Sequence, residues 1–354
     1  MRLRQKMPTQ GGTKRLFDVE ALIHWFAEEK REFPWRETPS PYAVWISEVM
    51  LQQTQASVVQ RYFLRWMAKF PTIRALAEAP LEEVIKQWEG LGYYSRARHI
   101  HEAAHYFMMY HQGNIPSSYE ALIKVKGLGR YTVGAILSFA FKQKKAAVDG
   151  NTLRVLTRYF AIREEVEKRQ AQEKIWRLAE ELLPEENPWE VVEGLIELGA
   201  VVCRKEPQCS LCPLRSSCLG FQQGIQRELP RKGKRVAITS LKRSVFVIVC
   251  EGTLLLKKGI RGSLMADLYE FPFVEGEKKG FPFDFVKEKI QPLSVEEHHF
   301  TRFKVTLYPE LWKAFERKEV PGYEWVLYAE IGKIPFSSGH RKILGQLTHA
   351  YFTH

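Results

Sequence analysis

The sequence predicts a multidomain protein in which an all-α domain is followed by an α+β domain. The chain has 354 residues, enough for two or three domains with their own cores. Apolar residues recur at helical spacing as far as about residue 200, whereas the two-residue period of strands begins near residue 244. A basic segment with proline and glycine separates the two patterns, as a linker does. We therefore expect a basic flexible tail over residues 1–13, the helical domain over 14–222, a basic linker over 223–240 and the α+β domain over 241–354.

The charge of the chain favours a polyanionic partner. Lysine and arginine exceed aspartate and glutamate by 12, and nucleic acid is the first candidate for such a surface, although ordinary basic proteins carry similar charge. No stretch approaches the roughly 18 uncharged apolar residues of a transmembrane helix. Residues 9–14 are polar where a signal peptide would be apolar. We therefore expect no membrane association.

The first predicted helix runs from Phe17 to Glu32 and is ended by Pro34. Pro39 and Pro41 keep the next loop extended. The second predicted helix, over residues 42–55, is short of charged residues.

Glu48 lies in this second helix, among apolar residues that include Trp45 and Val49. A carboxyl group held against apolar neighbours is favoured in its neutral form, so Glu48 can donate a proton near neutral pH. The alternative is a solvated or ion-paired glutamate, which is the commoner fate of this residue in a helix. This helix by itself leaves the two interpretations about equal. Asp149, further along the chain, favours the catalytic interpretation.

Helical pattern continues over residues 61–86, with Pro71 and Pro80 as breaks. Another helix begins near residue 95, where Tyr93 and Tyr94 stand beside Arg96 and Arg98. Aromatic rings and guanidinium groups in this pattern suit DNA, because bases stack and phosphates are anionic. Aromatic residues at the start of a helix also serve as core anchors.

The stretch from Leu122 to Asn151 has the most informative pattern. Gly127 and Gly129 predict a tight turn after a short helix, and apolar spacing from Val133 onward predicts a second helix. Glycine lets a backbone approach a ligand, and the free N–H groups of a helix start attract an anion such as a DNA phosphate. A Gly-x-Gly turn is also a frequent plain connection between helices. Further helices are predicted over residues 152–162, 174–183 and 191–202.

Four of the five cysteines lie close together in the sequence, at Cys203, Cys209, Cys212 and Cys218. They do not resemble a secreted disulfide framework, and we expect a reducing, cytoplasmic setting. Clustered thiolates suit a soft metal, and both zinc and a 4Fe-4S cluster are compatible with the ligand type. Structural cysteines without a metal are the remaining alternative.

The last part of the chain has strand periodicity. Residues 244–250 and 253–256 predict a hairpin about Gly252, with further strands over 300–308 and 325–329. Ser338 is the expected cap of a helix from Gly339 to about Leu347. These elements predict an α+β domain.

The run G-L-G-R-Y-T-V-G-A from Gly127, with V-D-G-N from Val148, resembles the helix–hairpin–helix signature of base-excision DNA glycosylases. Within that superfamily the chain resembles the adenine DNA glycosylases of the MutY type, from about Leu16 to Cys218. The run from Leu268 to Pro272 resembles the Nudix-like C-terminal domain of these enzymes. The glutamate pattern of Nudix hydrolases is missing from the sequence, so we expect this domain to bind and not to hydrolyse.

The resemblance implies roles for individual residues in removing a base. Glu48 would protonate adenine, and Asp149, as a carboxylate, would stabilise the developing sugar cation. Tyr131 and Asn151 would orient these groups. Substrate-binding positions implied in the same way are Arg31, Trp35 and Glu193. Glu193 as a plain helical carboxylate is nearly as good an interpretation.

The resemblance also implies DNA contacts and a cofactor. The implied DNA-binding residues are Leu51, Gln53, Tyr93, Gly127, Gly129, Arg130, Phe300 and Thr301. The four cysteines would hold a 4Fe-4S cluster, but the gap between Cys203 and Cys209 is one residue shorter than in the family, which leaves zinc open. Arg302 stands where the family has histidine in the loop that senses 8-oxoguanine, so transfer of that function is in doubt.

These inferences predict a monomeric, monofunctional DNA-repair glycosylase that removes adenine opposite 8-oxoguanine or guanine in double-stranded DNA. A bacterial, nucleoid-associated setting is expected. One alternative is a bifunctional glycosylase/lyase of the endonuclease III type, which would need an amine nucleophile where this chain has Tyr131. Another is a non-catalytic DNA-binding module, against which Glu48 argues.

Overall fold

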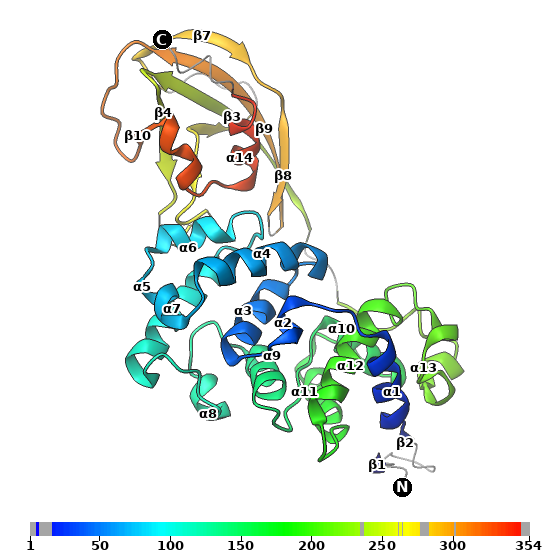
Figure 1. The fold of residues 1–354 in the computed structure, drawn as a ribbon. Helices are drawn as coiled ribbons and strands as arrows, with labels where there is room; N and C mark the ends of the chain where they lie inside the picture. The colour runs from blue at the N-terminus through cyan, green and yellow to red at the C-terminus, as the bar shows by residue number, and fades with distance from the viewer. Residues whose placement is uncertain are drawn as a thin grey trace. The chain divides into compact units, whose positions relative to one another are not determined.

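The structure is a computed structural model that describes residues 5–6, 16–233, 237–260, 262–263, 265–276, 283–300 and 302–347. The chain forms two compact units (Figure 1). Unit 1 contains Met1–Ala77 and Glu102–Arg235, and unit 2 contains Glu78–His101 and Val236–His354. One division falls inside the expected linker. Residues 78–101 group with the strand-rich unit, whereas the sequence placed them with the helical domain. The expected limits of the domains stay a prediction.

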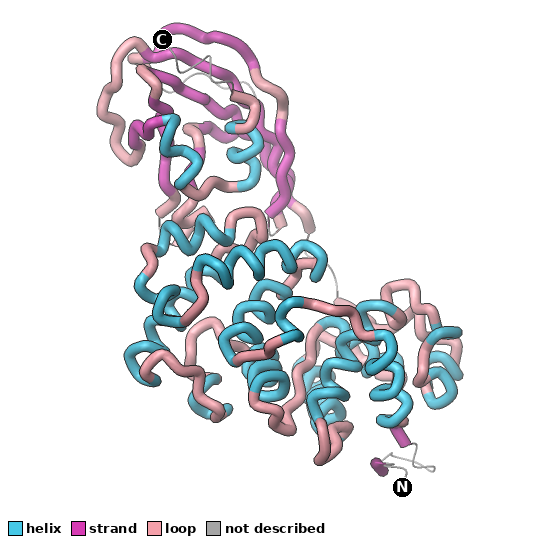
Figure 2. The backbone as a smooth tube through the Cα atoms, viewed as in Figure 1, coloured by secondary structure: helices cyan, strands magenta, loops and turns pink. Residues whose placement is uncertain are grey.

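Unit 1 is built from helices, as Figure 2 shows. In chain order these are α1 (Val19–Glu29), α2 (Pro34–Glu37), α3 (Pro41–Leu51), α4 (Ala56–Lys69), α5 (Ile73–Glu78), α8 (Tyr119–Leu122), α9 (Arg130–Ala135), the π-helix η1 (Ile136–Ala140), α10 (Gly150–Tyr159), α11 (Arg169–Glu181), α12 (Pro188–Val201) and α13 (Leu219–Gln222). The short 3₁₀ turns η2 (Cys209–Leu211) and η3 (Arg215–Ser217) lie between Cys203 and Cys218, in what is called the cysteine segment below. Strand β1 (Gln5–Lys6) pairs with β2 (Leu16–Phe17) near the N-terminus. Helix α7 (Ser95–His111) has residues in both units.

The start of the helical region differs from the prediction at two places. Helix α1 ends at Glu29, and Pro34 begins the short helix α2 instead of ending α1. Proline is favoured at a first helical position because it has no N–H to leave unsatisfied. The predicted helix over residues 42–55 is broken after Leu51, and Gln53 has a left-handed φ of 58°.

Helix α3 lies at the centre of unit 1. Ser40 caps its start by accepting a hydrogen bond from the backbone N–H of Ala43 at 3.1 Å, and every residue from Tyr42 to Met50 is buried. Burial on all sides explains why the sequence of this helix lacks charge. It also means that Glu48 is inside the protein and not on its surface.

Unit 2 contains an eight-stranded mixed sheet in the order β10-β4-β3-β9-β7, with β5 beside β4, β6 beside β3 and β8 beside β9. The strands are β3 (Thr239–Cys250), β4 (Thr253–Lys258), β5 (Tyr269–Glu270), β6 (Phe273–Glu275), β7 (Val286–Pro292), β8 (Glu296–Phe300), β9 (Phe303–Ala314) and β10 (Glu324–Leu327). Helix α6 (Leu81–Trp88), the 3₁₀ segment η4 (Tyr328–Lys333) and α14 (Ser338–Leu344) complete the unit. None of the helices among the described residues combines the length and the hydropathy needed to cross a bilayer.

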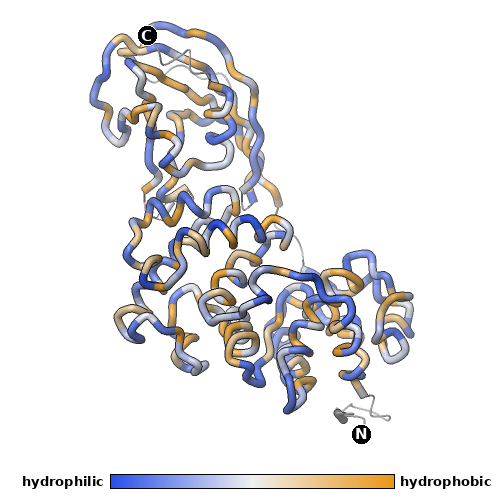
Figure 3. The backbone as a smooth tube through the Cα atoms, viewed as in Figure 1, coloured by the Kyte–Doolittle hydropathy of each residue, from blue (hydrophilic) through white to orange (hydrophobic). Residues whose placement is uncertain are grey.

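Strand β3 contributes to hydrophobic cores on both faces of the sheet. Val245, Val247 and Val249 belong to one core, whereas Phe246 and Ile248 belong to the other, as the two-residue period of a strand requires. Hydrophobic residues recur along the backbone of this unit (Figure 3). The expected β3–β4 hairpin is confirmed. The expected strand over residues 300–308 is wrong at its start, because Phe300 ends β8 and β9 begins only at Phe303.

Candidate active site

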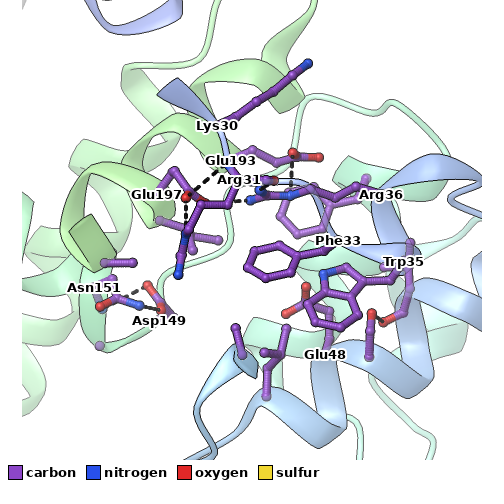
Figure 4. Close-up of a pocket in the computed structure, with 18 of the residues that line it drawn as sticks. Lys30, Arg31, Phe33, Trp35, Arg36, Glu48, Asp149, Asn151, Glu193 and Glu197 are labelled. Atoms are coloured by element: carbon purple, nitrogen blue, oxygen red, sulfur yellow. Dashed lines mark hydrogen bonds and ion pairs between the residues drawn. The ribbon is translucent and has the colours of Figure 1, made fainter. Parts of the chain in front are cut away.

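A cleft of about 1650 Å³ opens within unit 1. Its walls come from the segment around α2, the end of α3, the start of α9, the start of α10 and one face of α12. The cleft brings together the four residues expected to be catalytic and the three expected to bind substrate. In Figure 4, Glu48 and Trp35 lie on one side of the view, and Asp149 and Asn151 on the other.

Glu48 is held in a form suited to proton donation. Its side chain is 6% exposed, and burial raises its pKa to about 7. The hydroxyl of Tyr131 donates a hydrogen bond to Oε2 of Glu48, which leaves Oε1 as the oxygen that can carry the proton. The Tyr131 hydroxyl stays protonated, because burial and the nearby carboxyl of Glu48 raise its pKa well above the usual value.

Asp149 is held differently, as the N-cap of α10. Its Oδ1 accepts the backbone N–H groups of Asn151 at 3.0 Å and Thr152 at 2.7 Å, and its Oδ2 accepts from the side-chain amide of Asn151 at 2.7 Å. Burial raises the pKa of Asp149, and these hydrogen bonds counter that rise because they favour the charged form. The N-terminus of α10 also favours a negative charge here. The hydrogen bonds around Asp149 thus stabilise its charged form, whereas burial favours the neutral form of Glu48.

One wall of the cleft is an aromatic and cationic layer. The rings of Phe33 and Trp35 stack with centroids 4.7 Å apart and an interplanar angle of 11°. The guanidinium groups of Arg31 and Arg36 lie over the Phe33 ring, at 5.0 and 5.2 Å from its centroid. A flat wall of this kind suits a planar base.

Helix α12 supplies two carboxylates to the same wall, and the sequence analysis had singled out only the first, Glu193. Its pKa is raised by burial, and an ion pair with Nε of Arg36 at 3.4 Å opposes that rise. The second is Glu197, which accepts hydrogen bonds from Arg31 and Arg36. Carboxylates at positions i and i+4 of a largely apolar helix face the same way, and this spacing was the signal that could have found Glu197.

The expected DNA-binding residues are only partly brought together. Leu51 and Gln53 line the cleft, and Gln52 donates to the hydroxyl of Thr132 at 3.2 Å. The turn before α9 depends on Gly127, whose φ is 90°. Gly129 is the N-cap of α9 in an extended conformation with φ −84°, so its turn does not require glycine.

Arg130 of unit 1 and Tyr93 of unit 2 are both exposed. The guanidinium of Arg130 lies 4.0 Å from the ring centroid of Trp176 and donates to Glu180 at 3.1 Å. Tyr93 is 46% exposed and belongs to unit 2.

The phosphate role suggested for Arg96 and Arg98 does not match the structure. Arg96 is buried and donates to the carbonyl groups of Leu91 and Gly92. Arg98 donates to the Ala266 carbonyl at 3.1 Å and to the Asp267 carboxylate at 3.3 Å. Both guanidinium groups are therefore engaged in contacts within the protein.

The expected lesion-sensing loop connects β8 to β9. Thr301 lies outside the described residues, and the backbone of Phe300 pairs with that of Phe303. The guanidinium of Arg302 lies 5.3 Å from the Phe303 ring centroid. His298, in β8, is buried and forms a hydrogen bond with the Ser338 hydroxyl at 3.1 Å.

A buried arginine contacts the side chains of two of the four clustered cysteines. Arg158 is 3% exposed and donates to the carbonyl groups of Cys203, Arg204, Lys205 and Leu229. Its Nη1 also lies 3.4 Å from Sγ of Cys203, and the Cys218 thiol lies 3.6 Å from the Arg158 carbonyl. Arg158 thus fixes the start of the cysteine segment on α10.

The thiols fit a group that supplies positive charge. Burial and the neighbouring thiolates raise the pKa values of Cys209, Cys212 and Cys218, that of Cys212 to about 12. Thiols whose pKa values are raised in this way ionise more readily beside a cation. Over the described ranges, no three His, Cys, Asp or Glu side chains converge closely enough to hold one metal ion.

Comparison with known proteins shows which protein families the two units of the chain resemble. Residues 46–181 match the family described as HhH-GPD superfamily base excision DNA repair protein, and residues 244–346 match the NUDIX domain. The chain is similar in structure to a thermostable thymine-DNA glycosylase, with a TM-score of 0.54 and 28% identity over 58% of this chain and 95% of that one. An endonuclease III in a DNA complex, at 24% identity and a TM-score of 0.51, shares the fold. The helix–hairpin–helix, the capping aspartate and the buried glutamic acid all lie within the region that matches this superfamily.

Curated relatives identify the family within that superfamily. The adenine DNA glycosylase of Buchnera aphidicola subsp. Baizongia pistaciae is 33% identical over 256 residues, which cover 72% of each chain. The adenine DNA glycosylase of Mus musculus is 44% identical over 58% of this chain. The chain belongs to the adenine DNA glycosylase family. It spans 42% of the mouse protein and 41% of the Homo sapiens protein that it matches.

Proposed function

We propose that this protein is a monofunctional adenine DNA glycosylase of base excision repair. Its substrate would be double-stranded DNA in which adenine is paired with 8-oxoguanine or guanine. The observation that carries the proposal is the pair of carboxyl groups in one cleft. Glu48 is buried, has a pKa of about 7 and is bonded to Tyr131, whereas Asp149 accepts three N–H groups that favour its charged form.

The chemistry follows from these two environments. The adenosine leaves the base stack and enters the cleft, where Phe33 and Trp35 offer a flat surface. Glu48 gives its proton to the adenine ring as the bond between base and sugar breaks, so the electron pair of that bond leaves with a neutral base. The carboxylate of Asp149 stabilises the sugar cation. Water then adds to the sugar carbon and gives up a proton, which restores the acid form of Glu48.

Three further residues orient the reacting groups. Tyr131 holds Glu48 through Oε2, and Asn151 holds Oδ2 of Asp149 through its side-chain amide. The amide oxygen of Asn151 accepts from Arg154 at 2.8 Å, and Arg154 also donates to the Cys203 carbonyl at 2.7 Å. The reactive carboxylate is thereby connected to the cysteine segment by hydrogen bonds.

The competing lyase activity needs an amine that attacks the sugar and forms a Schiff base. The corresponding position is Tyr131, whose hydroxyl is engaged by Glu48 and cannot form one. This supports the monofunctional reaction, in which water is the nucleophile.

We also propose that Cys203, Cys209, Cys212 and Cys218 hold a 4Fe-4S cluster, with zinc as the alternative. The family and the soft donor set support the cluster. Its contribution would be to fix the segment from Cys203 to Cys218, and no step of the reaction passes through it. We further propose that the protein acts as a monomer on DNA in a bacterial nucleoid, and that Phe300 and Thr301 contact the base opposite adenine.

A single-turnover assay tests the reaction. The duplexes would contain adenine opposite 8-oxoguanine, adenine opposite guanine, or thymine glycol, each incubated with and without borohydride. We expect release of adenine from the first two duplexes and no covalent adduct. Cleavage of the thymine glycol duplex with a trapped adduct would favour the lyase instead. Binding to all three without base release would favour a non-catalytic module.

A further inference from the structure

Glu197 is a buried carboxylate that has no part in the reaction steps above. Its side chain is 1% exposed. Oε1 accepts from Nε of Arg31 at 2.5 Å and from the Arg31 backbone N–H at 3.4 Å, while Oε2 accepts from Nη2 of Arg36 at 3.0 Å. Cationic donors thus occupy both oxygens of a side chain that has almost no contact with water.

The two arginines held by Glu197 make up the cationic part of the aromatic wall. Besides its bond to Glu197, Arg36 donates to the Arg31 carbonyl at 2.8 Å and pairs with Glu193 at 3.4 Å. Nε and the backbone N–H of Arg31 both donate to Glu197. The terminal nitrogens of Arg31 have no hydrogen bond within the described ranges. Its side chain is 44% exposed. Those nitrogens are therefore available as donors to a ligand in the cleft.

The charge of Arg36 also lowers the pKa of Glu48, against the larger effect of burial. The charged and titratable groups that face Glu48 are Tyr131 from α9, Asp149 at the start of α10, Glu193 from α12 and Arg36 from α2. Arg36 is the cation in this set, and its charge favours the ionised form of Glu48. Two carboxylates, Glu193 and Glu197, share its charge in the folded protein.

We propose that Glu197 is a positioning residue for base removal, which holds Arg31 as a donor toward the flipped base and keeps Arg36 paired with the carboxylates of α12. This inference rests on the proposed glycosylase reaction. It assigns Glu197 no contact with the substrate. If Glu197 carried no charge, Arg36 would keep only Glu193 as a carboxylate partner, and the guanidinium of Arg31 would lose the carboxylate that holds it.

The test uses the full chain and the single-turnover rate of adenine release as a function of pH. For Glu197→Gln we expect the rate at neutral pH to fall by at least about tenfold. We also expect the alkaline limit of activity to move down by roughly half a pH unit, because Arg36 then acts more strongly on Glu48. Glu186→Gln, an exposed change of equal charge just before α12, is the matched control and should keep both values.

Two companion variants separate positioning from structural support. Glu197→Asp keeps the charge but shortens the reach, so the rate should fall while the alkaline limit stays at the wild-type pH. In the double variant Glu197→Gln/Arg36→Gln the excess cation is gone, and the alkaline limit should not lie below that of the wild type. These two variants also provide the test if Glu197→Gln fails to fold.

The inference is overturned if all three variants lose rate only in proportion to their folded fraction, measured by thermal unfolding, with one common pH limit. A wild-type protein that releases no adenine would refute the proposed function. Wild-type release together with an unaffected Glu197→Gln variant would refute only the role of Glu197.

Discussion

Glu48 and Asp149 are carboxyl groups of similar intrinsic acidity, and the protein separates them by local structure. Glu48 comes from the middle of α3, where all neighbours from Tyr42 to Met50 are buried and few groups can solvate a charge. Asp149 comes from a helix start, where backbone N–H groups have no other partner. A side chain in the first environment retains a proton, whereas one in the second is stabilised as an anion.

Replacing Glu48 by glutamine should abolish base excision and leave DNA binding intact. The amide has nearly the same shape as the acid but no proton to give, and general acid catalysis contributes about 10² to 10⁴ in rate. Single-turnover excision and binding to a duplex with an uncleavable adenine analogue would measure the two effects, with Glu186→Gln as control. Excision within tenfold of the wild-type rate would remove Glu48 from the role of acid.

The same substitution should change how stability depends on pH. Because the folded pKa of Glu48 is about 7, above its usual 4.5, ionising this group costs folding free energy. The cost is absent below about pH 4.5, grows as pH rises and is complete above about pH 7. At pH 8 the free energy of unfolding of Glu48→Gln should therefore exceed that of the wild type by up to roughly 3 kcal/mol. The variant should also unfold at a higher temperature than the wild type at this pH. Base excision by the wild type should decline over the same rise through pH 7. Equal stability differences at pH 4 and pH 8 would contradict this ionisation.

At the scale of elements, α10 and α12 meet without room for a side chain. A Cβ on Gly199 would lie 2.6 Å from Cβ of Asn151 and 2.8 Å from its carbonyl oxygen. Gly199→Ala should therefore destabilise the fold by about 2 to 3 kcal/mol and slow excision, since Asn151 and Asp149 must shift. Chemical denaturation and single-turnover rates would measure both effects. Gly332→Ala, where a Cβ meets nothing within 4 Å, is the control, and equal effects of the two changes would refute this account.

The cysteine segment gives a second prediction at this scale. Purified anaerobically with iron supplied, the protein should be straw-brown and contain about four irons per chain, because a 4Fe-4S cluster is ligated by four cysteines. Metal analysis and the visible spectrum would measure this, and Cys250→Ser, outside the segment, should change neither. A colourless protein with one zinc per chain would identify the alternative site.

Local sequence patterns predicted the elements that carry chemistry better than their ends. The apolar surroundings of Glu48 and the placement of Asp149 after the hairpin both follow from spacing within one or two helices. The end of α3 did not, because the left-handed Gln53 has no glycine to signal it. Glu197 was missed because its partners, Arg31 and Arg36, lie more than 160 positions earlier in the chain. Contacts at that separation are set by tertiary packing, which a single sequence does not display.

At the scale of the whole molecule, the segment 78–101 joins the strand-rich unit through a polar hub. Glu89 accepts from Arg341 at 2.6 and 3.1 Å, from the backbone N–H of Phe336 at 3.2 Å and from Lys86 at 2.6 Å. These groups are mostly shielded from water, so removing one side leaves buried charge without a partner. Sequence pattern could not assign this segment to unit 2, since its helices have the same period as those of unit 1.

This hub determines what a truncation should do. A chain ending after Gly233 keeps Glu48, Asp149 and the Leu229 carbonyl that Arg158 binds. It loses Arg341 and Phe336, which donate to Glu89 in the full chain. We expect it to be less stable than the full chain and still to release adenine opposite guanine. Discrimination for 8-oxoguanine should weaken, because Phe300 and Thr301 are gone.

The measurement is the ratio of single-turnover rates for adenine opposite 8-oxoguanine and opposite guanine, taken per folded molecule. Full-length Arg341→Leu breaks the hub without removing the β8–β9 loop, so it should lose stability and keep the wild-type ratio. If the truncated chain also keeps the ratio, the strand-rich unit does not recognise the lesion. If Arg341→Leu lowers the ratio as far as truncation does, recognition depends on how the hub holds the segment 78–101, and the loop containing Phe300 is not its source.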